Sequence, residues 1–182
     1  MATLKKTRRC SLVAGLLLGL AGFAGCSTTP EKPKAGSAGN MLAVGPYRLD
    51  APVEGLPGLV EWTEAEYQDI GRQFRGERNY NAPPVSFLGG QWRLMLGTVN
   101  GRIYRIAPSI AFSDKETATE ALTVVVRFYR GVLGEPAKPQ AGIYAWNAPQ
   151  ASVILQTAEA SDGLGIQLFL TSASTQNFQK FP

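Results

Sequence analysis

Apolar residues recur every three or four positions from Ser113 to Leu133, and this spacing predicts a long amphipathic helix. Ser113 to Glu116 reads as a capping box at its start, and Gly134 and Pro136 follow its end. The run of three valines at 124–126 favours a strand locally, but the length and period of the stretch favour a helix. The predicted core-facing stripe consists of Ala118, Leu122, Val125, Tyr129 and Val132.

A shorter helix is predicted to begin at Thr63. Thr63 and Glu66 have the spacing of a capping box, while Trp62 and Tyr67 occupy the two positions of a hydrophobic staple. Gly76 is the expected end of this helix, because glycine commonly follows the last helical residue.

The pattern changes to strands between residues 85 and 112, with runs at 87–88, 92–99 and 102–107. Asn100 and Gly101 join the last two runs and favour a type I′ turn, which needs two positive φ angles. The register that follows places Val99 opposite Arg102, Gly97 opposite Tyr104, and Met95 opposite Ile106. Tyr104 is therefore expected to cover the bare backbone of Gly97.

Three further strand-like runs follow at 143–146, 152–157 and 165–171, separated by short turns at 147–150 and 160–163. Strands joined by such short links pair antiparallel. The predicted fold class is therefore α+β: a mainly antiparallel sheet of about five strands, with the long helix packed on one face and a shorter N-terminal helix.

The N-terminus carries a basic cluster, an apolar run from Ser11 to Ala24, and the sequence Phe23-Ala24-Gly25-Cys26. A positively charged start, a short apolar segment and small residues before a cleavage point are typical of a secretory signal peptide. The run is too short for a spanning helix, which needs about 20 apolar residues. The basic cluster consists of Lys5, Lys6, Arg8 and Arg9.

These residues resemble the signal of bacterial lipoprotein precursors, whose lipobox ends in cysteine, although Phe23 stands where leucine is usual. The resemblance implies cleavage between Gly25 and Cys26 and attachment of diacylglycerol to the Cys26 thiol. It also implies an anchor in the outer membrane, facing the periplasm, because Ser27 follows the cysteine. Arg8 and Arg9 leave the choice between the general secretory route and the twin-arginine route open.

Cleavage at this point changes the charge of the protein. The whole chain has 18 basic and 14 acidic side chains, for a net charge of +4. All four residues of the basic cluster leave with the signal, so the mature chain has no net charge. The sequence therefore gives no reason to expect nucleic acid as a partner.

The chain is predicted to comprise a signal peptide at 1–25, the lipidated Cys26 and a flexible tether at 26–40, and one globular domain at 41–182. The tether is rich in Ser, Thr, Pro and Gly and has no large apolar side chain to bury.

Histidine is absent from the sequence, which removes the usual general base and most zinc sites. Cys10 leaves with the signal and the Cys26 thiol is acylated, so neither provides a nucleophile. No pair of carboxylates stands out, and no phosphate-binding or calcium motif is present. We therefore expect no cofactor, no metal and no enzyme activity.

The leading hypothesis is a non-enzymatic accessory or adaptor protein, anchored to the membrane by acyl chains and bound to another envelope protein. Candidate partner-binding residues are Trp146, at the end of a predicted strand, and Arg102 and Arg105. Core packing for the tryptophan and solvation of the sheet for the arginines are the alternative interpretations. The alternative function is a carrier or sensor that holds a small apolar ligand or lipid between helix and sheet.

Overall fold

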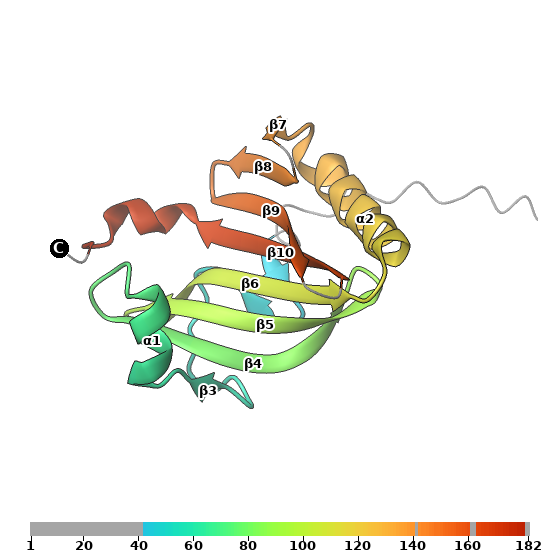
Figure 1. Cartoon of the computed structure of the whole chain (residues 1–182). Helices are drawn as coiled ribbons and strands as arrows, with labels where there is room; N and C mark the ends of the chain where they lie inside the picture. The colour runs from blue at the N-terminus through green and yellow to red at the C-terminus, as the bar shows by residue number, and fades with distance from the viewer. Residues whose placement is uncertain (1–41, 141, 161–162, 181–182) are drawn as a thin grey trace, which may run out of the picture. The chain divides into compact units, whose positions relative to one another are not determined.

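A computed structural model describes residues 42–140, 142–160 and 163–180 (Figure 1). The helices in this part of the chain are α1 (Glu64–Ile70), α2 (Lys115–Leu133) and the 3-10 helix η1 (Ala173–Asn177). The strands are β1 (Ala43–Val44), β2 (Tyr47–Arg48), β3 (Val60–Glu61), β4 (Glu77–Phe87), β5 (Gly90–Val99), β6 (Arg102–Phe112), β7 (Ala137–Gln140), β8 (Ile143–Ala148), β9 (Ala151–Ala160) and β10 (Gly163–Ser172).

The predicted α+β class with about five strands is wrong, because the described chain is mostly β. The main sheet has eight strands in the order β3-β4-β5-β6-β10-β9-β8-β7, all paired antiparallel, and β1 and β2 form a separate two-stranded ribbon. The prediction of one long helix on a small sheet therefore underestimated how much of the chain forms strands.

The longest strand missed by the sequence pattern is β4. Its polar residues and the adjacent Pro83 and Pro84 argue against a strand, since proline cannot donate a ladder hydrogen bond. The structure accommodates them at a register shift between Ala82 and Val85. On its other side β4 pairs with β3 only at Tyr80 and Asn81, so the prolines lie where that edge has no partner.

The sheet consists of two meanders, β3 to β6 and β7 to β10, which join where β6 pairs with β10 (Figure 1). Helix α2 connects the end of β6, in the centre of the sheet, to β7 at its far edge. Strands distant in sequence are thereby brought together at the centre, and their side chains alternate between the two faces.

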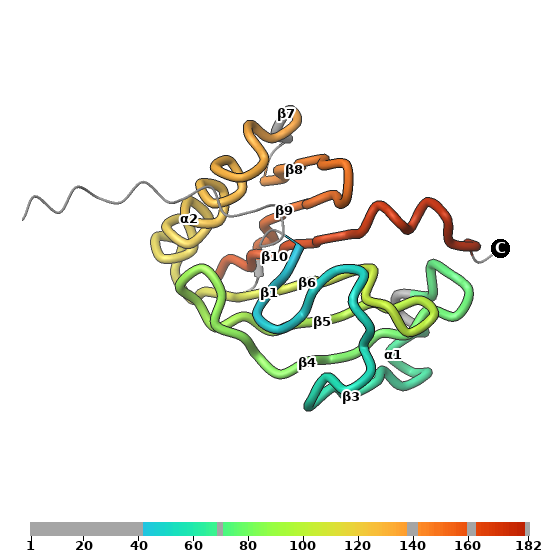
Figure 2. Tube along the Cα trace, turned by 180° about the vertical axis from the view of Figure 1, so that it is seen from behind, coloured from blue at the N-terminus to red at the C-terminus, as the bar shows by residue number. Residues whose placement is uncertain are grey.

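One face of the sheet carries the main hydrophobic core. The ribbon β1–β2 and helix α2 both contribute to it, and Figure 2 shows the ribbon lying across β5 and β6. The largest fully buried side chains of this core come from β5, β6, α2 and β8–β10: Trp92, Leu96, Ile103, Ile106, Tyr129, Trp146, Leu155, Ile166, Leu168 and Leu170.

The beginning of α1 confirms the predicted capping box. The Glu66 carboxylate accepts hydrogen bonds from the Thr63 backbone nitrogen at 2.6 Å and from its hydroxyl at 2.9 Å. The rings of Trp62 and Tyr67 lie 5.7 Å apart, as the staple requires. The helix ends at Ile70, earlier than predicted, because Gly71 adopts φ 74°.

Helix α2 also confirms its prediction, with a change of one residue at the cap. Asp114, not Ser113, is the N-cap, and its carboxylate accepts a hydrogen bond from the Thr117 nitrogen at 2.7 Å. Gly134 ends the helix, and the buried residues include Ala118, Val125 and Tyr129 of the predicted stripe.

The hairpin turn has the two positive φ angles that the sequence predicted, 52° at Asn100 and 73° at Gly101. Val99 pairs with Arg102 as predicted. A register shift between Gly97 and Thr98 then places Gly97 opposite Arg105, not Tyr104, and Met95 opposite Ala107. The Tyr104 ring still covers Gly97, because a Cβ at Gly97 would lie 2.9 Å from Tyr104 Cε1.

Candidate interaction surface

The second face of the sheet, here called the outer face, carries the candidate site. It is formed by the side chains of β5, β6, β10 and β9 that point away from the main core, since alternate residues of a strand lie on opposite faces. The paired residues line up across these strands in three neighbouring rows. The small row contains Ala111, Gly165 and Ala158, the polar row contains Arg93, Ser109, Gln167 and Gln156, and the apolar row contains Met95, Ala107, Phe169 and Ile154.

The apolar row is partly accessible to solvent, and Ala107 is its buried member. Ile154 is 40% exposed, while Met95 and Phe169 are half-buried. Ile143 of β8 lies opposite Gln156 and is 41% exposed. Isolated exposed apolar side chains are common, but a row of them beside polar groups is typical of a protein interaction surface.

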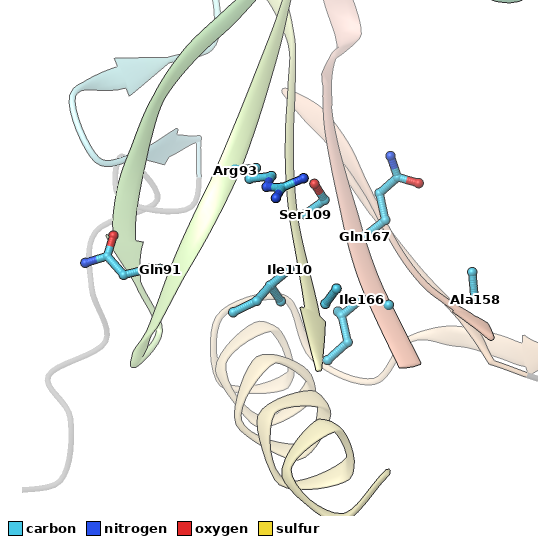
Figure 3. A pocket seen from close by; sticks show the side chains of 9 residues that line it. Gln91, Arg93, Ser109, Ile110, Ala158, Ile166 and Gln167 are labelled. Atoms are coloured by element: carbon cyan, nitrogen blue, oxygen red, sulfur yellow. The ribbon is translucent and has the colours of Figure 1, made fainter. Parts of the chain in front are cut away.

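A hollow of about 430 Å³ lies beside the apolar row. The small row contributes to its lining, together with Gln91 and three members of the polar row: Arg93, Ser109 and Gln167. In Figure 3, Arg93 of β5 extends toward Ser109 of β6, whereas Ile110 and Ile166 point toward α2. The hollow therefore has polar walls and a base of small side chains.

Among the described residues that line this hollow, Arg93 is the charged one. Its side chain forms no ion pair with the part of the chain that the structure describes. Gln156 donates from Nε2 to Oε1 of Gln167 at 3.0 Å, which orients the Gln167 amide and leaves its nitrogen available as a donor. The hollow thus presents donors from an arginine, a serine and a glutamine.

The far end of the outer face is closed by a second, smaller core. Phe74 and Phe178 pack edge-on against the Tyr104 ring, with centroid distances of 5.2 and 5.9 Å. This cluster covers the sheet around Val99 at that end of the outer face.

A buried polar network lies under this closed end. The Glu77 side chain is fully buried and accepts hydrogen bonds from the Tyr104 hydroxyl at 2.5 Å and from Arg105 Nη2 at 3.3 Å. Its other oxygen accepts from the backbone nitrogens of Gln73 and Phe74. Burial, and to a lesser degree the bond to Glu77, raise the pKa of Tyr104 well above its usual value, so the hydroxyl remains a donor.

Asn79 extends this network, since its Oδ1 accepts from Arg105 Nη2 at 3.3 Å. Two buried donors, Asn79 Nδ2 and Arg105 Nε, have no hydrogen-bond partner among the described residues. The network connects β4, β6 and the segment after α1. The network therefore has a structural role, and Arg105 takes part in it through its contacts with Glu77 and Asn79.

The candidate partner-binding residues from the sequence therefore lie in three different environments. Arg102 is exposed at the hairpin turn, and the Arg105 side chain is only 12% exposed and paired with Glu77. Trp146 has the alternative environment, core packing: it is 2% exposed, donates to the Gly134 carbonyl at 3.0 Å and packs against Tyr129. The sequence analysis did not identify Arg93 as a candidate, because Arg93 lies opposite Ser109 only through the register shift between Gly97 and Thr98.

A second polar cluster, also missed by the sequence analysis, lies beside β10. The Ser172 hydroxyl lies 2.8 and 2.9 Å from the two carboxylate oxygens of Asp50, and the Ser174 hydroxyl donates to Asp50 Oδ1 at 3.0 Å. Asp50 has φ 62°. Since these residues are 122 positions apart or more, no local signal could pair them. The cluster connects the N-terminal ribbon to the C-terminal strand.

Several sequence predictions concern residues outside the described ranges. They include the cleavage site at Gly25 and Cys26, the lipid attachment at Cys26, and the tether. No helix in the described part of the chain is long and apolar enough to span a membrane. The same residues contain no cluster of three or more acidic or sulfur ligands that could hold a metal ion.

The described carboxylates are mostly engaged in structural contacts. Glu66 and Asp114 serve at helix starts, and Glu77 lies in the buried network.

Comparisons with protein-family models, curated proteins and solved structures found no match to this chain.

Proposed function

We propose that this protein is a lipid-anchored component of the bacterial cell envelope that acts as a non-enzymatic adaptor and binds another envelope protein through its outer face. The observation that carries the proposal is the accessible apolar row beside an arginine-containing hollow. Interaction surfaces combine apolar contact with a polar surround.

The N-terminal signal supports the location. Acyl chains on Cys26 would hold the domain at the membrane surface, because more than one chain gives stable anchoring where a single chain does not. A position at the outer membrane, facing the periplasm, follows the resemblance of this signal to those of lipoprotein precursors. Replacing Cys26 with alanine is expected to release the protein from the membrane fraction or to leave an unprocessed precursor. Processed, membrane-bound protein in that variant would contradict the anchor.

The residue inventory supports a binding role. The chain has no histidine, and its two cysteines lie in the signal and at the acylation site. The buried Glu77 is neutralised by Arg105 and has no access to a substrate. Purified protein is therefore expected to bind a partner saturably and to leave peptidoglycan, ester and phosphate substrates unchanged.

The direct test is site-specific photocrosslinking in intact envelopes. A photoreactive amino acid placed at Ile154 on the outer face should capture one envelope protein. The matched control is Val60, which is 64% exposed on the edge strand β3 and lies outside the outer face. The same capture from both positions, or none from Ile154, would contradict the proposal.

A groove of about 420 Å³ beside α2 favours the second candidate, a carrier or sensor of an apolar ligand or lipid. Leu122, Val126 and Tyr144 form its apolar part, and Arg127 and Arg130 flank it. Saturable binding of a fluorescent fatty acid, lost in Thr123→Asp at an exposed residue of the groove but retained in Ile154→Asp, would favour the carrier over the adaptor.

A further inference from the structure

The hollow on the outer face has a donor-rich wall and one arginine, which forms no ion pair with the described residues. Arg93, Ser109 and Gln167 lie on adjacent strands in the polar row, where Ser109 pairs with both of the others. Neighbouring strands are about 4.8 Å apart, so these donors span about 10 Å. A guanidinium flanked by neutral donors matches a carboxylate, which accepts hydrogen bonds only.

The small side chains at the base of the hollow permit the close approach of another polypeptide chain. Gly165 pairs with Ala111 on one side and with Ala158 on the other, so three small residues lie side by side on three strands. Ala111 and Ala158 are exposed. These small side chains leave room for another chain to lie against this part of the sheet.

The apolar row defines the second requirement on the occupant. Met95 and Phe169 follow Arg93 and Gln167 by two positions on the same strands and the same face. Two residues along a strand correspond to about 7 Å. An occupant that uses both rows presents a carboxylate and an apolar group at that separation, as an acidic and an apolar residue two positions apart in an extended segment do.

A small ligand fits this surface less well than a protein segment does. Small-molecule sites bury about 70–90% of their ligand, whereas this hollow lies on one face of a sheet and is enclosed on that side alone. A protein partner supplies the remaining cover itself.

We propose that the hollow and the apolar row bind an acidic segment of the protein partner, in which a carboxylate pairs with Arg93 and an apolar residue two positions away packs against Met95 and Phe169. This inference rests on the proposed function and specifies the chemistry of the partner. It also assigns Arg93, rather than Arg102 or Arg105, as the arginine that selects the partner.

The test uses the full mature chain in detergent micelles and two labelled peptides. One peptide repeats glutamate, serine, leucine and serine, and its twin has glutamine in place of glutamate. Fluorescence anisotropy should report binding of the acidic peptide, and Arg93→Gln should weaken that binding about tenfold, the loss expected for a hydrogen bond to a charged group. The control is Arg48→Gln, an exposed arginine on β2, which should leave binding unchanged.

Equal binding of the two peptides, or equal affinity in wild type and Arg93→Gln, would overturn the inference. Arg93-dependent binding of phosphatidylglycerol vesicles without peptide binding would also overturn it and assign the hollow to a lipid headgroup. Photocrosslinking at Ile154 in an Arg93→Glu background separates the two proposals. If capture is lost in the Arg93→Glu background but present in the wild-type background, the partner segment is acidic. If capture is retained in the Arg93→Glu background, the acidic segment is contradicted, but the outer face remains the interaction surface. Absence of capture in the wild-type background contradicts the surface itself.

Discussion

The Tyr104 hydroxyl donates to the buried Glu77 carboxylate at 2.5 Å, across 27 positions of sequence. This bond joins β6 to the start of β4, directly under the aromatic cluster that closes one end of the outer face. The closed end is thus fixed by a polar contact as well as by apolar packing. At the open end, Arg93 forms no ion pair with the described residues.

Replacing Glu77 with glutamine is expected to destabilise the fold by about 3–5 kcal/mol, because Arg105 loses its buried counter-charge. The amide also places a donor against Tyr104 or against the backbone nitrogens of Gln73 and Phe74, all of which donate to Glu77. Urea unfolding monitored by circular dichroism measures the change. Arg78→Gln is the control, since its pair with Glu61 is exposed, and it should cost less than about 1 kcal/mol. Similar losses in both variants would contradict the buried network.

Gly97 is expected to tolerate no side chain. A Cβ there would lie 2.9 Å from Tyr104 Cε1 and 3.2 Å from Arg105 Nε, so Gly97→Ala must displace the ring or the guanidinium. Such overpacking costs about 1–3 kcal/mol. Gly131 in α2 has open space around it, and Gly131→Ala should stabilise by about 0.5–1 kcal/mol. Thermal unfolding of the two alanine variants should therefore shift in opposite directions, and an unchanged or raised midpoint in Gly97→Ala would count against the packing of Tyr104 over Gly97.

The cap of α2 makes a pH-dependent contribution to stability. Hydrogen bonds from the Thr117 backbone and side chain lower the pKa of Asp114 below its usual value of 3.8. A group whose pKa is lower in the folded state stabilises the fold above its unfolded pKa, and this contribution is lost as the pH falls through the folded pKa. Asp114→Ala should therefore lower the thermal midpoint at neutral pH, and the difference from wild type should shrink in acid, below the usual pKa. A difference that is independent of pH would argue against the charged cap.

Local signals in the sequence predicted the elements whose structure depends on neighbouring residues. The capping box at Thr63 and the Asn100–Gly101 turn belong to this class, because each is decided within a few positions. Strand β4 could not be predicted in this way. Its polar residues and two prolines are tolerated only because of the register shift and the unpaired edge beside them.

The candidate surface depends on long-range pairing, which explains why the sequence identified its residues poorly. Arg105 and Trp146 have the composition of binding residues, yet Glu77 and the Gly134 carbonyl engage them inside the protein. The position of Arg93 beside Ser109 and Gln167 follows from the pairing of β6 with β10, more than 50 residues apart. Only the fold brings these donors together.

The most direct test of the adaptor role compares two aspartate substitutions at exposed β positions. Tagged mature protein carrying Ile154→Asp or Val60→Asp is isolated from native envelopes, and the amount of the partner captured at Ile154 is quantified against wild type. Both variants should keep the wild-type thermal midpoint, since both side chains are exposed. Ile154→Asp should reduce co-isolation about tenfold or more, as expected for loss of an interface residue that contributes at least 1.4 kcal/mol, whereas Val60→Asp should leave it unchanged. Undiminished co-isolation with Ile154→Asp, or an equal loss with Val60→Asp, would contradict the outer face as the binding surface.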